Sequence, residues 1–121
     1  MDEKIEVVFE ADMSDNDEKA SYASTIRNLN SIPEVEFTPG GGLFGVADTI
    51  KGFIGIPHVD KAIDKTAEVL GKWVETKKET TKSKKLRIKI GEDVLDIKGI
   101  DFKKGETEAV IKAFLMSRKN K

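Results

Sequence analysis

The sequence contains no cysteine and a single histidine, His58, and both shortages restrict its chemistry. Without cysteine the chain forms no disulfide, no thiolate metal site and no cysteine nucleophile. One histidine cannot build a multi-histidine metal centre. No run of about 20 apolar residues is present, so no ordinary transmembrane helix is expected. Asp2 and Glu3 stand where a signal peptide would be positively charged, and we therefore expect a cytoplasmic location.

Aromatic residues are also scarce, at 7% of the 121 residues, against 38% hydrophobic and 36% charged residues. This mixture is typical of one domain with a thin core and a heavily charged surface. The charges are unevenly spread, because residues 1–38 carry ten acids and three bases while residues 72–121 carry eight acids and fifteen bases. Such halves can attract each other within one fold or between copies. The basic half has no interleaved aromatics, so no nucleic-acid partner is expected.

The spacing of apolar residues predicts a single α+β domain over residues 1–121. The expected order is strand-helix-strand-helix-helix-strand-strand-helix, with a small sheet of about four strands and the helices packed on one face. The predicted strands cover 4–11, 34–38, 86–90 and 94–97, and the helices cover 14–30, 42–56, 58–78 and 105–118. A charged connector over 75–85 follows Trp73, and Gly91, Glu92 and Asp93 form the tight turn of the hairpin.

The glycine-led segment over 39–57 is the most unusual part of the chain. Its apolar residues recur at helical intervals in GLFGVADTIKGFIGI, which predicts an amphipathic helix. At about 22 Å this helix could lie in a membrane interface but is too short to cross a bilayer alone. The apolar stripe could pack onto the sheet, bind a partner or a second copy, or contact a membrane after a conformational change. The candidate partner- or membrane-binding residues are Leu43, Phe44, Val46, Ile50, Phe53, Ile54 and Trp73.

We interpret the remaining motifs as structural features and not as functional sites. Glycines 40, 42 and 45 spell G-x-G-x-x-G, but the chain lacks the repeated parallel β-α-β units of a dinucleotide-binding fold, so a turn or hinge is preferred. His58 and Asp60 are too close in sequence to face each other as a catalytic pair. The acids Asp60 and Asp64, like those of the hairpin (Glu92, Asp93 and Asp96), are interleaved with lysines and read as solvated surface. We therefore expect no catalytic residue, no metal and no cofactor, and hence no enzyme.

The order of these features resembles the effector-associated constant component family of bacterial conflict and immunity systems. The resemblance is carried by IPEVEFTP, GGGLFGVADTIKGFI, WVETKKETTKSKK, LRIKIGEDVLDIKG and GETEAVIKAFL, and it covers nearly the whole chain. It implies a non-enzymatic accessory module that binds an effector protein, such as a peptidase, or is processed by it. The alternative is a latent membrane-disrupting effector whose amphipathic helices over 42–78 are released by cleavage or conformational change.

Overall fold

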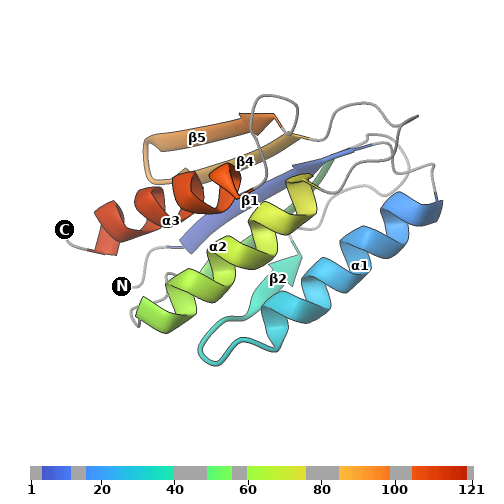
Figure 1. Ribbon diagram of the computed structural model, residues 1–121, viewed down its shortest axis with the longest axis horizontal. Helices are drawn as coiled ribbons and strands as arrows, with labels where there is room; N and C mark the ends of the chain where they lie inside the picture. Colours follow the sequence, from blue (N-terminus) through green and yellow to red (C-terminus); the bar gives the residue numbers. More distant parts are fainter. Residues whose placement is uncertain are drawn as a thin grey trace.

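The computed structural model describes residues 4–11, 16–39, 49–55, 60–75, 85–98 and 105–119, which form an α+β domain. Its elements are β1 (Lys4–Glu10), α1 (Asn16–Asn30), β2 (Phe37–Pro39), β3 (Thr49–Gly55), α2 (Asp60–Glu75), β4 (Lys85–Ile90), β5 (Asp93–Lys98) and α3 (Glu106–Lys119). The strands make one sheet in the order β2-β3-β1-β4-β5, with every neighbouring pair antiparallel. All three helices cover the same face of this sheet, which confirms that part of the prediction (Figure 1).

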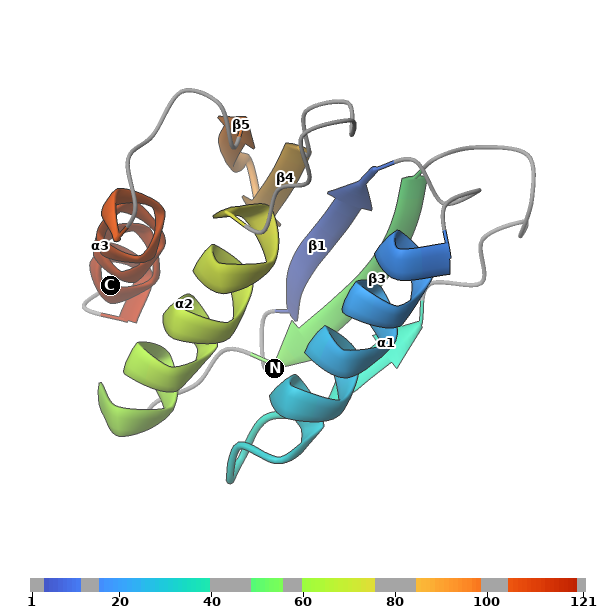
Figure 2. The same cartoon turned by 45° about the vertical axis from the view of Figure 1, so that its right-hand side comes forward.

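The first six elements form two interleaved β-α-β units. In each unit the two strands are separated by a strand of the other unit, which gives the split β-α-β arrangement of ferredoxin-like domains. The hairpin strand β5 and helix α3 extend this core at the margin next to β4. Figure 2 shows α1, α2 and α3 lying side by side over the sheet, and none of the described helices covers the opposite face.

The prediction of a helix over residues 42–56 is wrong for its second half. Thr49–Gly55 form β3, an inner strand that pairs with β1 over seven residues and with β2 over three. The domain therefore has five described strands instead of about four, and a strand replaces the first central helix of the predicted order. The physical reason is that β1 buries one whole face and needs a paired strand on each side, so sheet pairing overrides the local helical spacing. Residues 40–48 lie outside the described part of the chain.

The core is built around Phe9 of β1. Its ring makes edge-to-face contacts with Trp73, Tyr22 and Phe37, at centroid distances of 4.9, 5.3 and 6.1 Å. Helix α2 buries eight of its sixteen residues against this core. Its buried residues are Ala62, Ile63, Thr66, Ala67, Leu70, Gly71, Trp73 and Val74.

The other helices and the hairpin follow the prediction with small corrections. Helix α1 ends at Asn30, as predicted, and buries Glu18, Thr25 and Leu29. Helix α3 buries Thr107, Ile111 and Leu115. The hairpin turn has only two residues, because Asp93 already pairs with Ile90. Gly91 has a φ of 60°, which suits the first central position of a type II′ turn.

Candidate functional site

The predicted partner- or membrane-binding residues do not share one surface in the described part of the chain. Ile54 and Trp73 are each 1% exposed and belong to the core. Ile50 and Phe53 are half-buried but point to opposite faces of β3, because side chains alternate along a strand. Phe53 lies on the face that carries no helix. The remaining candidates, Leu43, Phe44 and Val46, lie outside the described residues.

The helix-free face of the sheet, which we call the open face, carries an excess of positive charge. Strand alternation and the cross-strand register assign its residues. Among the described strand residues, six cations and three anions share this face, a net charge of +3. The cations are Lys4, Lys51, Lys85, Arg87, Lys89 and Lys98, and the anions are Glu6, Glu10 and Asp96.

Two short ion pairs order part of the open face. Lys51 contacts Glu6 at 2.7 Å across β3 and β1, and Arg87 donates to Asp96 at 2.7 Å across β4 and β5. The hydrogen bond and charge of Asp96 raise the pKa of the Arg87 guanidinium above its ordinary value. Both pairs are exposed to solvent, so they fix side-chain positions more than they stabilise the fold.

The uneven charge distribution of the sequence is explained by the register of β1 against β4. Glu6 stands opposite Lys89 and Glu10 stands opposite Lys85. The acidic first part of the chain is therefore placed beside the basic second part inside one fold. The cation excess remains because β4 and β5 contribute more bases than β1 has acids.

Apolar side chains are set among these charges. Val8 and Phe53 are half-buried at diagonal positions of β1 and β3, and Val94 of β5 is 47% exposed. The ammonium nitrogen of Lys51 lies 6.0 Å from the Phe53 ring centroid, at the outer limit of a cation–π contact. The open face thus combines cations with a small apolar centre.

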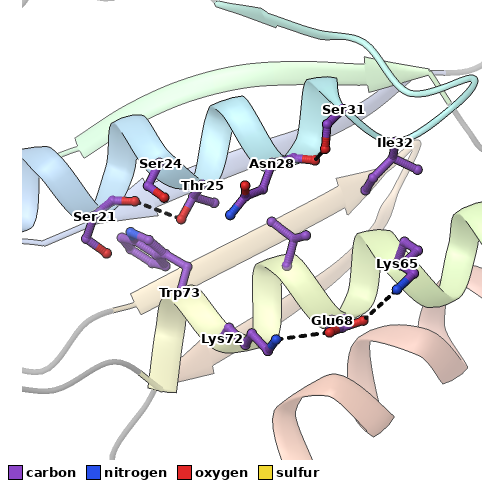
Figure 3. Close-up of a pocket in the computed structure, with 11 residues that line it drawn as sticks. Ser21, Ser24, Thr25, Asn28, Ser31, Ile32, Lys65, Glu68, Lys72 and Trp73 are labelled. Carbon is purple, nitrogen blue, oxygen red and sulfur yellow. Dashed lines mark hydrogen bonds and ion pairs between the residues drawn. The ribbon is translucent and has the colours of Figure 1, made fainter.

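A second feature is a groove of about 410 Å³ between α1 and α2 (Figure 3). Its α1 wall is made of small polar side chains, which leave space where larger residues would close the contact. Its α2 wall carries charged side chains, with Trp73 between the two helices. The lining residues are Ser21, Ser24, Thr25, Asn28, Ser31, Ile32, Lys65, Glu68, Val69, Lys72 and Trp73.

The groove offers hydrogen-bonding groups but a poor proton acceptor. Lys72 donates to Glu68 at 3.0 Å and Lys65 lies 3.7 Å from the same carboxylate. Lys72 first, and Lys65 second, lower the pKa of Glu68, so this carboxylate stays ionised and is a weak base. The hydroxyls of Thr25 and Ser31 donate to carbonyl oxygens of their own helix turn, those of Ser21 and Asn28.

Within the described ranges, no group of three or more His, Cys, Asp or Glu side chains could hold a metal ion. No described helix has the length and apolar character needed to cross a bilayer. The fold and surface define an α+β domain with a cationic open sheet face. No protein-family model, no curated protein and no solved structure matches this chain.

Proposed function

We propose that this chain is a non-enzymatic interaction module that binds an acidic surface of a partner protein through its open sheet face. The observation that carries the proposal is the net charge of +3 on the described residues of that face, around half-buried Val8 and Phe53. Complementary charge steers association and fixes orientation, while an apolar centre supplies the contact area that excludes water.

A protein fits this face better than a nucleic acid does. Glu6, Glu10 and Asp96 lie among the cations and would repel a phosphate backbone at close range. Phe53 is the one aromatic side chain that the described strands present there, whereas binding of single strands relies on several stacking platforms. A mainly acidic protein surface with some bases of its own can match both signs.

The biological setting of the proposal comes from the family resemblance. It implies an accessory protein of a bacterial defence system that works with an effector, such as a peptidase, encoded beside it. The open face is then the surface that contacts this effector. In that setting the chain contributes recognition, and the chemistry belongs to its partner.

The membrane-disrupting alternative now requires an additional step. Residues 49–55 would have to leave the sheet, because they pair with β1 over seven positions and with β2 over three. Ile54 would also have to leave the core, where it is 1% exposed. The folded domain therefore favours the interaction module, and dye release from anionic vesicles is the measurement that would support the alternative.

The test removes two cations from the open face and compares them with two cations elsewhere. Lys85→Gln with Lys89→Gln lowers the charge of the open face by two, whereas Lys19→Gln with Lys61→Gln makes the same change on α1 and α2. The probe is the purified effector encoded next to this chain, with affinity measured by calorimetry. We expect the first pair to weaken binding about tenfold, which corresponds to about 1.4 kcal/mol, and the control pair to change it little.

Added salt should weaken binding of the wild type more than binding of the Lys85→Gln, Lys89→Gln variant. An equal loss of affinity in both double variants would contradict the proposal that the open face is the interface. Binding of a single-stranded oligonucleotide more tightly than the effector would overturn the choice of a protein partner.

A further inference from the structure

The two edges of the sheet are protected very differently. The edge strand β2 has three residues and ends at Pro39, which cannot donate a ladder hydrogen bond. The edge strand β5 has six residues and no proline, and its register with β4 runs through six consecutive pairs without a bulge. Among the described residues, no strand pairs with its outer edge. Natural proteins usually blunt such an edge unless another strand pairs with it.

Apolar side chains line the β5 edge on both faces. Val94 is 47% exposed on the open face, and Leu95 is half-buried on the helix face. Helix α3 lies at the same margin of the domain (Figure 1). Its Lys112 contacts Asp64 of α2 at 2.9 Å, which shows which side of α3 faces α2.

Val110 and Phe114, the apolar residues two positions to either side of Lys112, lie on the other side of α3. Each is about 160° around the helix from Lys112 at 100° per residue, and both are half-buried. Neither side chain shares the contact of Lys112 with α2, and Phe114 packs against the buried core. The feature that this margin offers to a partner is therefore the backbone edge of β5, with Val94 and Leu95 on its two faces.

We propose that a second copy of the chain pairs with this edge, β5 against β5, in an antiparallel arrangement about a two-fold axis through Leu95. The two five-stranded sheets then form one ten-stranded sheet, and both open faces lie on the same side. The inference does not rest on the proposed function, because the surface involved is the edge and not the open face.

The register follows from symmetry and charge. A two-fold axis must pass through a residue that faces its own copy, and within β5 the possible centres are Val94, Leu95, Asp96 and Ile97. Centring on Leu95 overlaps residues 92–98 and sets Glu92 opposite Lys98 of the second copy twice. Centring on Asp96 sets two carboxylates opposite each other, which is unfavourable. Centring on Val94 or on Ile97 overlaps only three residues of the strand, 93–95 or 96–98.

The Leu95 register places apolar groups at its centre. Leu95, which is half-buried, faces its own copy on the helix side. Val94 lies opposite Asp96, whose carboxylate is already held by Arg87 at 2.7 Å. Asp93 lies opposite Ile97 and is the one unfavourable pair of this register. The length of the overlap and the balance of charge and apolar contact still favour Leu95 over the other centres.

The first experiment reverses the charge of Glu92 or Lys98, which lie opposite each other at both ends of the proposed β5–β5 interface. Light scattering after size-exclusion chromatography, over a concentration series, gives the dimer dissociation constant. Glu92→Lys and Lys98→Glu should each weaken the dimer about tenfold, because each places like charges opposite each other twice. The double variant restores both pairs and should return close to wild type. Two single losses that simply add in the double variant would contradict the register.

The second experiment reads the register directly, since the natural chain has no cysteine. Leu95→Cys, Asp96→Cys and Ile97→Cys are oxidised separately, and circular dichroism confirms that each variant is folded. Only the residue on the axis lies near its own copy, so Leu95→Cys should give a covalent dimer and the other two should stay monomeric on denaturing gels. A dimer formed mainly by Asp96→Cys or Ile97→Cys would overturn the Leu95 register. The proposal itself would be overturned if the wild-type chain stayed monomeric up to its solubility limit. It would also be overturned if β5 paired with a strand of another protein and not with a second copy.

Discussion

The contact between Gly52 and Phe37 gives the sharpest test of the sheet, because β3 is the element that the sequence did not predict. Gly52 lies on the helix face of β3, and the Phe37 ring of β2 covers it. A Cβ at position 52 would lie 2.0 Å from Cζ of Phe37 and 2.4 Å from its Cε2. A Cβ at Gly55 of the same strand would meet no atom within 4 Å, so Gly55 provides a matched control.

The cost of Gly52→Ala follows from how firmly Phe37 is held. Phe37 is 5% exposed and packs edge-to-face on Phe9 at 6.1 Å, so its ring cannot move aside without losing core contacts. Overpacking costs about 1–3 kcal/mol, and an aromatic pair contributes about 0.5–1.5 kcal/mol beyond its buried area. We expect Gly52→Ala to lower the free energy of unfolding by about 3 kcal/mol. Gly55→Ala should leave it within about 0.5 kcal/mol or raise it slightly.

Urea unfolding followed by circular dichroism measures both variants, and an unchanged slope would show that the denatured state is the same. At about 4 °C per kcal/mol, Gly52→Ala should lower the melting temperature by about 12 °C. Combining Gly52→Ala with Phe37→Leu removes the ring atoms that clash, so the double variant should lose at least about 1 kcal/mol less than the sum of the singles. Equal stability of Gly52→Ala and Gly55→Ala would refute the placement of Phe37 over Gly52, and with it the register of β2 on β3.

Two further predictions concern α3 and the single tyrosine. The Glu75 carboxylate accepts hydrogen bonds from the Gly105 amide at 2.7 Å and from the buried Thr107 hydroxyl, so Glu75→Ala should cost about 1–3 kcal/mol in urea unfolding, and no loss would contradict its role as a cap of α3. Burial raises the pKa of Tyr22, which packs on Phe9, so the absorbance of tyrosinate should appear only above the ordinary value of 10.0. Because the folded form holds this proton longer, the associated stability is complete below pH 10 and is lost as the pH rises through the folded pKa. An ordinary midpoint in the folded protein would contradict the burial of the Tyr22 ring.

The sequence predicted those elements whose pattern is long or locally complete. Helix α2 carries apolar residues through four turns, and β4 alternates strictly up to the glycine turn that leads into β5. Strand β3 was missed because seven residues can satisfy two periods at once. Ile50, Phe53 and Ile54 have helical spacing, yet Ile50, Gly52 and Ile54 also alternate along one strand face. The choice is made by β1 and β2, which are distant in sequence and supply the pairing.

The candidate site was predictable only in part for the same reason. The apolar stripe looked continuous in sequence, but strand alternation sends Ile54 into the core and Phe53 to the open face. The alternation of Arg87 and Lys89 with buried residues did indicate a solvated basic face on β4. Its excess charge could not be assessed, because it depends on which strands lie beside β4. The small polar residues Ser21, Ser24 and Asn28 recur on one side of α1, and Ser31 follows directly after it; this spacing was the sequence signal for the groove.

The charge division of the chain explains why both proposed interactions involve the same half of the sheet. Glu6 and Glu10 of β1 stand opposite Lys89 and Lys85 of β4, so these two acids partly offset the positive charge of β4. Beyond β4, the sole described acid on the open face is Asp96, and Arg87 occupies it. The positive charge is therefore concentrated on β4, whose Lys85, Arg87 and Lys89 share the open face, while the charges of Asp96 and Lys98 on β5 cancel. A second copy paired at this edge would bring two such regions together, and Glu92 of each copy would meet Lys98 of the other. The two Glu92–Lys98 pairs would reduce the electrostatic repulsion between the copies at the β5–β5 interface. Lys85 and Lys89 of both copies would stay available to one acidic partner.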